Sequence, residues 1–99
     1  MDAQYSHARG NFFSAVRSLA TSSDTLQNRL IDAHDSVLAV KLDEFEGDIE
    51  LKIKLARILD LMGVDRDGIE TAVVENAAHM GDLEATKLAE LICDFFYEL

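Results

Sequence analysis

The sequence has no proline and no tryptophan, and it has only one cysteine among its 99 residues. A lone cysteine, Cys93, excludes an intrachain disulfide and any zinc site built from several cysteines. No apolar run approaches the roughly 18–20 residues that a membrane-spanning helix needs. Residues 1–5 lack the basic and apolar regions of a secretory signal. We therefore expect a chain that stays out of membranes and resides in the reducing cytoplasm.

Basic residues are also scarce, with 9 Lys and Arg against 19 Asp and Glu, for a formal net charge of −10. The imbalance lies entirely in residues 42–99, because residues 1–41 hold equal numbers of acids and bases. An acidic surface repels phosphate backbones and anionic membranes, so we expect no nucleic-acid partner and no membrane partner. The same surface favours basic partners.

What is abundant is apolar sequence, since hydrophobic residues make up 48% of the chain and charged residues 28%. These proportions are typical of globular proteins and not of disordered ones. Ninety-nine residues form one domain, here 1–99, because a second core would be too small to fold unaided. A domain of this size has one packed core and little room for a deep pocket.

Apolar residues recur at helical spacing along most of the chain, which predicts an all-α fold, a compact bundle of about five helices. Asp24, Asp48, Asp65 and Asp82 are each placed to cap the helix that follows. The expected helices cover residues 2–20, 25–42, 49–62, 66–80 and 82–99, and the clearest loop covers residues 43–48.

One segment has a second interpretation. Residues 49–55 alternate between apolar and polar side chains with the period of a strand, and so do Leu38, Val40 and Leu42 before them. An α+β fold with a hairpin around residues 38–55 is therefore the alternative. Helix is favoured because Glu46-Gly47 is a weak hairpin turn and residues 56–62 continue as strong helix formers.

The apolar surface of the expected helices is wider than one small core requires, which indicates contact with another chain. The last helix has a broad apolar arc, and Tyr97 lies outside it among acidic residues, as a binding anchor would. The third helix has a second apolar stripe on a different face. The candidate interface residues are Phe95, Phe96, Tyr97, Leu99, Ile49 and Ile53.

The acid-rich loop offers an alternative function, in which the chain neutralises a basic partner as an antitoxin, an immunity protein or a nucleic-acid mimic. Binding through such a surface weakens steeply with salt. The candidate acidic surface consists of Asp43, Glu44, Glu46, Asp48 and Glu50.

A second alternative is a metal-dependent nucleotide phosphohydrolase. The pairs Asp32/Asp35 and Asp67/Glu70 each share a helix face at a spacing that can hold magnesium, and His34 lies beside Asp35. Solvated carboxylates at this spacing are common on helix surfaces. We therefore expect no enzyme, no catalytic residues, no bound metal and no cofactor.

The sequence thus predicts a non-catalytic protein–protein interaction domain. Because its apolar stripes exceed the needs of one core, we expect it to self-associate through apolar helix faces, as a homodimer.

Overall fold

The computed structural model describes residues 5–62 and 80–99. Within these ranges it contains four α-helices and one short 3-10 helix, and no strand. The α-helices are α1 (Ser6–Thr21), α2 (Leu26–Leu38), α3 (Ile49–Leu61) and α5 (Asp82–Glu98), and η1 (Leu42–Phe45) is the 3-10 helix. The predicted all-α fold is confirmed. Of the expected helix at 66–80 the structure describes only Met80, which is not helical, and Asp65, Asp67 and Glu70 lie outside the described residues.

Helix α1 follows the predicted stripe, because Ala8, Phe12, Ala15 and Leu19 are its buried residues. The cap of α2 differs from the prediction by one position. The N-cap is Thr25, whose hydroxyl accepts the backbone N–H of Asn28 at 3.2 Å. Both residues around this start can cap a helix, and local sequence does not distinguish them.

The second helix ends earlier than predicted, at Leu38 and not at Leu42. The chain then turns through η1, which places Phe45 in the core with no exposed surface. The turn is held by two reciprocal bonds. Glu44 N–H donates to the Lys41 carbonyl at 3.1 Å, and Lys41 N–H donates to Glu44 Oε2 at 2.7 Å. Burial of Phe45 explains why the helix cannot continue straight.

Helix α3 excludes the hairpin at 38–55. Its N-cap Asp48 accepts the Leu51 N–H at 3.2 Å, as predicted. In a strand, residues 49, 51, 53 and 55 would share one face. Here Leu51 and Leu55 are buried while Ile49 and Ile53 are exposed, which is the period of a helix.

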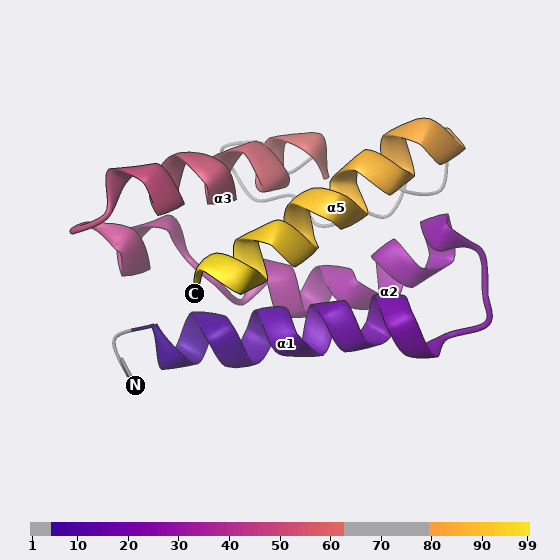
Figure 1. Ribbon diagram of the computed structural model, residues 1–99, viewed down its shortest axis with the longest axis horizontal. Coiled ribbons are helices and arrows are strands. Elements are labelled where there is room, and N and C mark those ends of the chain that lie inside the picture. The colour runs from indigo at the N-terminus through magenta and orange to yellow at the C-terminus, as the bar shows by residue number, and fades with distance from the viewer. Residues whose placement is uncertain (1–4, 63–79) are drawn as a thin grey trace.

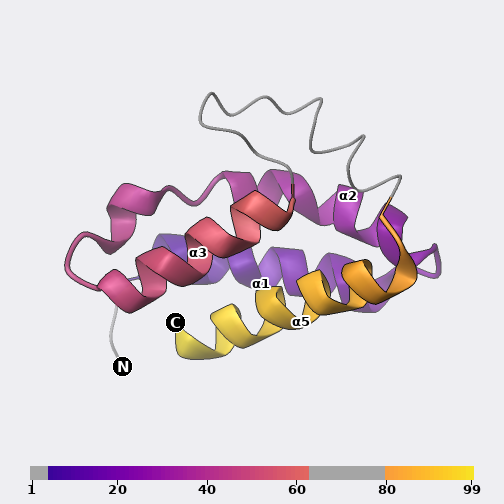
Figure 2. The ribbon, with the colours of Figure 1, turned by 90° about the horizontal axis from the view of Figure 1, so that it is seen from above.

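Helix α5 packs against α1, α2 and α3 and so lies at the centre of the arrangement. In Figure 1 it crosses between α1 and α3, and it runs antiparallel to both. In Figure 2, seen from above, α2 and α5 lie on opposite sides of the view, with α1 between them and farther from the viewer. The predicted capping by Asp82 is wrong, since the N-cap is Gly81 and Asp82 is the first helical residue. The carboxylate of Asp82 instead accepts a hydrogen bond from Gln27.

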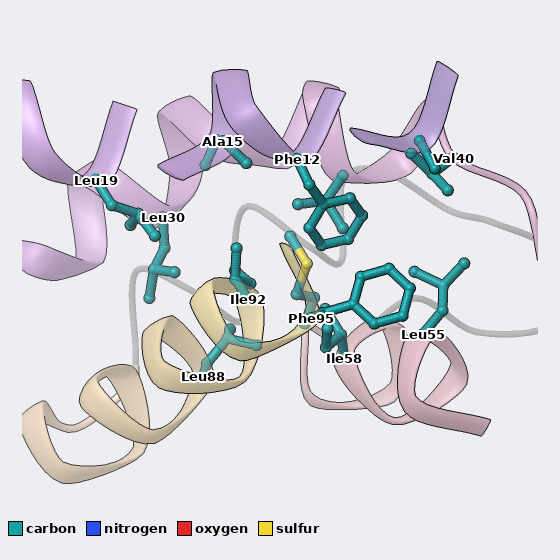
Figure 3. Close-up of a cluster of buried hydrophobic side chains, with 14 of the residues drawn as sticks. Phe12, Ala15, Leu19, Leu30, Val40, Leu55, Ile58, Leu88, Ile92 and Phe95 are labelled. Carbon is teal, nitrogen blue, oxygen red and sulfur yellow. The ribbon is translucent and has the colours of Figure 1, made fainter. Parts of the chain in front are cut away.

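The core lies where these helices meet and is entirely apolar among the described residues (Figure 3). Three aromatic rings form its centre: Phe95 lies 4.7 Å from Phe12 and 5.6 Å from Phe45 between ring centroids. These rings join α1, η1 and α5. The radius of gyration is 12.7 Å, close to the ~13 Å of a compact chain of this length. No helix in the described ranges is long and apolar enough to span a membrane.

Candidate interaction surface

Two pairs of adjacent phenylalanines divide between the core and the surface. Successive helical residues point about 100° apart, so both members of a pair cannot face the core equally. Phe12 is buried while its neighbour Phe13 is 53% exposed. In the same way Phe95 is buried and Phe96 is half-buried. Phe13 and Phe96 meet on the outside of the bundle, with ring centroids 6.0 Å apart.

Tyr97 extends this pair of rings into a larger apolar area. Its ring lies 6.4 Å from that of Phe96, and the side chain is 86% exposed. We call Phe13, Phe96 and Tyr97 the aromatic surface. It spans α1 and α5, which are far apart in sequence and packed together in the fold. Exposed aromatic residues that touch one another are typical of protein-binding surfaces.

An open groove of about 450 Å³ lies along the aromatic surface, lined by Ser6, Arg9, Gly10, Phe13 and Phe96. Gly10 is in the interior of α1, where glycine costs about 1 kcal/mol relative to alanine. A Cβ atom at this position would meet nothing within 4 Å. Packing inside the chain therefore does not explain the glycine, while a neighbour that approaches the groove closely would.

The two sides of the aromatic surface carry opposite charges. Arg9 and Arg17 are exposed on α1, one helical turn before and after Phe13. Glu90 and Asp94 are exposed on α5, on the turns that precede Tyr97. None of these four side chains forms an ion pair within residues 5–62 and 80–99. Their charges are therefore available to another molecule.

The predicted interface residues of the last helix have different environments. Phe95 is 1% exposed, so the core of the single chain already uses it. Phe96 and Leu99 are half-buried against the core cluster. Tyr97 is the member that presents most of its surface to solvent.

Ile49 and Ile53 form a separate apolar stripe. They are 72% and 62% exposed and lie on adjacent turns of α3, on the face opposite the buried Leu51 and Leu55. The structure does not bring them into contact with the aromatic surface, because α3 packs on α5 through its other side.

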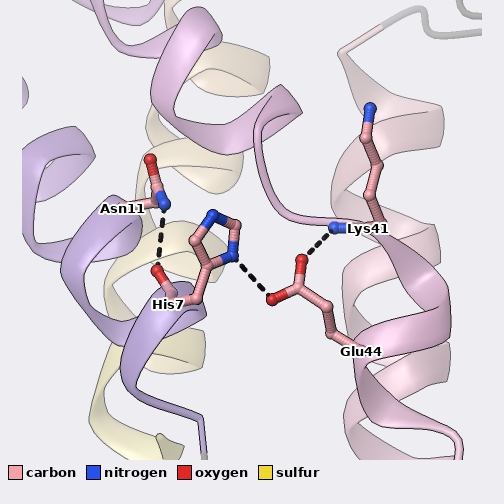
Figure 4. A network of polar contacts seen from close by, with 4 residues as sticks. All are labelled: His7, Asn11, Lys41 and Glu44. Carbon is pink, nitrogen blue, oxygen red and sulfur yellow. Dashed lines mark hydrogen bonds and ion pairs between the residues drawn. The ribbon is translucent and has the colours of Figure 1, made fainter.

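The candidate acidic surface is largely engaged within the chain. Glu44 accepts a hydrogen bond from His7 Nδ1 at 2.8 Å, which joins η1 to α1 (Figure 4). Glu46 pairs with Lys52 at 2.9 Å, and Asp48 caps α3. Asp43 and Glu50 remain exposed and have no such bond in the described part of the chain. Folding therefore uses three of the five carboxylates that the sequence offered for recognition.

The bonds at Glu44 also affect its ionisation. Partial burial acts to raise the pKa of Glu44, but the hydrogen bonds from the Lys41 backbone and the His7 ring outweigh it. The net effect is a pKa below the ordinary 4.5. This carboxylate thus stabilises the fold in its charged form.

A second groove, of about 240 Å³, lies between α3 and α5. Its lining includes the apolar residues Ile58, Leu91 and Phe95 and the charged residues Lys54 and Glu98. Lys54 and Glu98 are in hydrogen-bonding contact across the two helices, and this contact raises the pKa of Lys54.

Cys93 is the single thiol and lies one turn before Phe96 and Tyr97 on α5. Burial, and then the nearby Asp94 carboxylate, raise its pKa. A thiol with a raised pKa is largely protonated at neutral pH and is a poor nucleophile.

The residues considered for metal chemistry do not form a cluster in the described ranges. No three His, Cys, Asp or Glu side chains there are grouped so as to hold a metal ion. Asp32 and Asp35 are exposed on α2. Asp35 lies 3.2 Å from His34 Nε2, and His34 Nδ1 contacts the Ile31 carbonyl oxygen in its own helix.

Comparison of the chain with protein-family models, curated proteins and solved structures found no match. The sequence-based prediction did not include Phe13, which belongs to the aromatic surface, or Gly10, which lines the groove. The signal for Phe13 was present, since it lies at the edge of the helical stripe whose centre is Phe12.

Proposed function

We propose that this chain is a non-catalytic protein–protein interaction domain that self-associates through apolar helix faces. The observation that carries the proposal is the aromatic surface, in which Phe13, Phe96 and Tyr97 form a chain of ring contacts outside the core. Phe12, Phe45 and Phe95 fill the centre of the core, and of the three outer rings only Phe96 packs partly against it.

The physical argument is the cost of leaving the rings in water. Each large aromatic side chain covers about 150–250 Å² when buried, and burial releases roughly 25 cal/mol per Å². Tyr97 and Phe13 are rigid, with few rotatable bonds, so little conformational entropy is lost when a partner covers them. The stripe of Ile49 and Ile53 on α3 provides a second apolar face of the same kind.

The direct test is the mass of the wild-type chain in solution at micromolar concentration, by sedimentation velocity or light scattering. We expect a mass above the 11.0 kDa of one chain. A wild-type protein that remains a monomer across this range would overturn the proposal.

Three variants show which of the two apolar faces mediates self-association. Phe13→Ser with Tyr97→Ser removes the aromatic surface, and Ile49→Ser with Ile53→Ser removes the α3 stripe. Ala39→Ser is the control, because Ala39 is an exposed apolar residue directly after α2 and lies outside both faces. We expect the first variant to be monomeric and the control to associate as the wild type does. Circular dichroism on every variant separates loss of association from loss of fold.

A further inference from the structure

The charges on the two sides of the aromatic surface indicate the kind of partner that fits it. Arg17 lies one turn beyond Phe13 on α1, and Glu90 lies two turns before Tyr97 on α5. Both are exposed, and neither forms an ion pair within the described ranges. A surface that is basic along one edge and acidic along the other is complementary to a copy of itself.

The contact between Phe13 and Phe96 sets the register of these charges. Helices α1 and α5 run antiparallel in Figure 1. With a helical rise of 1.5 Å per residue, Arg17 lies about 6 Å beyond Phe13, and Glu90 about 9 Å before Phe96. Because the helices run in opposite directions, both charges lie toward the same end of the aromatic surface. The two positions differ by about 3 Å along the helix axes, which is within the reach of an arginine side chain.

Two copies can meet face to face across this surface in three ways. Placing α5 on α5 brings Glu90 and Asp94 of both copies together, and placing α1 on α1 does the same for Arg9 and Arg17. Both arrangements set like charges against each other, which disfavours association. Placing α1 on α5 sets the basic edge of each copy against the acidic edge of the other. Electrostatics therefore selects the third arrangement.

The size of a stable interface and the glycine in α1 also favour the arrangement of α1 on α5. A stable dimer covers about 800 Å² on each chain, more than three partly buried rings offer. The contact must therefore extend over the charged edges. In the α1-on-α5 arrangement the exposed Tyr97 of each copy faces α1 of the other, where Gly10 leaves the groove open.

We propose that the aromatic surface binds a second copy of this chain through a two-fold axis that sets α1 of each chain across α5 of the other. In this dimer Arg17 faces Glu90 of the partner subunit, and the contact occurs twice. The proposal rests on the self-association proposed above and adds its geometry and its charge pairing.

Charge reversal with rescue tests the pairing. Arg17→Glu sets two acids against each other at the contact between positions 17 and 90, and Glu90→Arg sets two bases against each other there, so each variant alone repels its own copy at this contact. We expect each to self-associate about tenfold more weakly than the wild type, because the two-fold axis repeats the lost contact. In an equimolar mixture each edge of one variant meets the opposite charge on the other. We therefore expect the heterodimer to regain wild-type affinity, detected by native mass spectrometry at its intermediate mass.

Matched controls come from α3. Arg57→Glu and Asp60→Arg change the net charge by the same amounts at exposed positions outside the aromatic surface. We expect both to associate as the wild type does and to show no preference for the heterodimer when mixed. Salt should weaken the self-association of the wild type, because it screens opposite charges at the interface. This weakening should be smaller in each of the two test variants.

The outcomes separate the two proposals. A wild-type monomer overturns self-association and, with it, this pairing. A wild-type dimer whose test variants associate normally, or whose mixture shows no preference for the heterodimer, overturns the pairing alone. Rescue in the mixture supports both.

Discussion

The ring of Phe13 on α1 lies 6.0 Å from the ring of Phe96 on α5, on the outside of the bundle. Their chain neighbours Phe12 and Phe95 lie 4.7 Å apart inside it. The same two helices thus make one aromatic contact that closes the core and another that remains open to solvent. This arrangement separates the residues that hold the fold from those available to a partner.

This division between core and surface predicts that substitutions at Phe12 and Phe13 lower the free energy of unfolding by different amounts. Phe12→Ala removes a fully buried ring and should lower the free energy of unfolding by about 3–5 kcal/mol. Phe13→Ala removes a ring that is 53% exposed and should cost less than about 1.5 kcal/mol in the single chain. Urea unfolding at a concentration low enough to keep the protein monomeric measures both. Equal losses would show that the two rings do not divide between core and surface.

The helical faces could be predicted because periodicity alone determines them. Leu51, Leu55 and Ile58 are buried on α3, whereas Ile49 and Ile53, which alternate with the two leucines, are exposed. The wide apolar arc of the last helix could be predicted from the same periodicity. A helix that packs on three others needs such an arc, and α5 packs on α1, α2 and α3.

What the sequence could not show depends on contacts between distant segments. Phe45 lies among acidic residues in a loop, and no periodic pattern marks it as a core residue. No pattern in the sequence joins Gln27 to residues 80 and 82, more than 50 positions away. The availability of the acidic loop was also hidden, because the pairing of Glu44 with His7 joins residues on two different elements.

Gln27 is expected to hold the start of α5 against α2. Its side-chain amide donates to the Met80 carbonyl at 3.0 Å and to Asp82 Oδ1 at 2.9 Å. Gln27→Met keeps the length of the side chain but leaves the partly buried Met80 carbonyl without its donor. We expect a loss of about 1–2 kcal/mol in the free energy of unfolding, measured by urea titration.

A second variant at the same position makes this prediction specific. Gln27→Glu also lacks the donor, and at neutral pH it places a carboxylate beside Asp82. It should therefore be less stable than Gln27→Met at pH 7 and should recover part of the difference in acid. If Gln27→Met unfolded as the wild type does, the bridge would have no role in stability.

Glu44 should contribute to stability above its unfolded pKa and lose that contribution in acid. The pKa of Glu44 is lowered in the folded chain, so the folded state favours the charged form. The contribution is therefore present above about pH 4.5 and disappears as pH falls through the folded pKa. Because the site is partly open to solvent, we expect Glu44→Gln to cost only about 0.5–1 kcal/mol at pH 7.

The measurement is urea unfolding of wild type and Glu44→Gln across the acid range. The difference between them should shrink toward zero below the folded pKa. Asp43→Asn is the matched control, since Asp43 is adjacent, exposed and without a hydrogen bond in the described part of the chain. A difference that stayed constant with pH would show that the loss comes from packing and not from the charge.

Gly10→Ala should move the stability of the single chain and the affinity of self-association in opposite directions. Alanine favours the interior of α1, and its Cβ meets nothing within 4 Å, so the monomer should gain about 1 kcal/mol. The same methyl group projects into the groove beside Phe13 and Phe96, where the second copy is expected to approach. Self-association should therefore weaken.

Chemical unfolding of Gly10→Ala under dilute, monomeric conditions measures the change in stability, and sedimentation at higher concentration measures the change in self-association. A variant that is more stable and associates as tightly as the wild type would show that the groove is not part of the contact, and the glycine would then need another explanation.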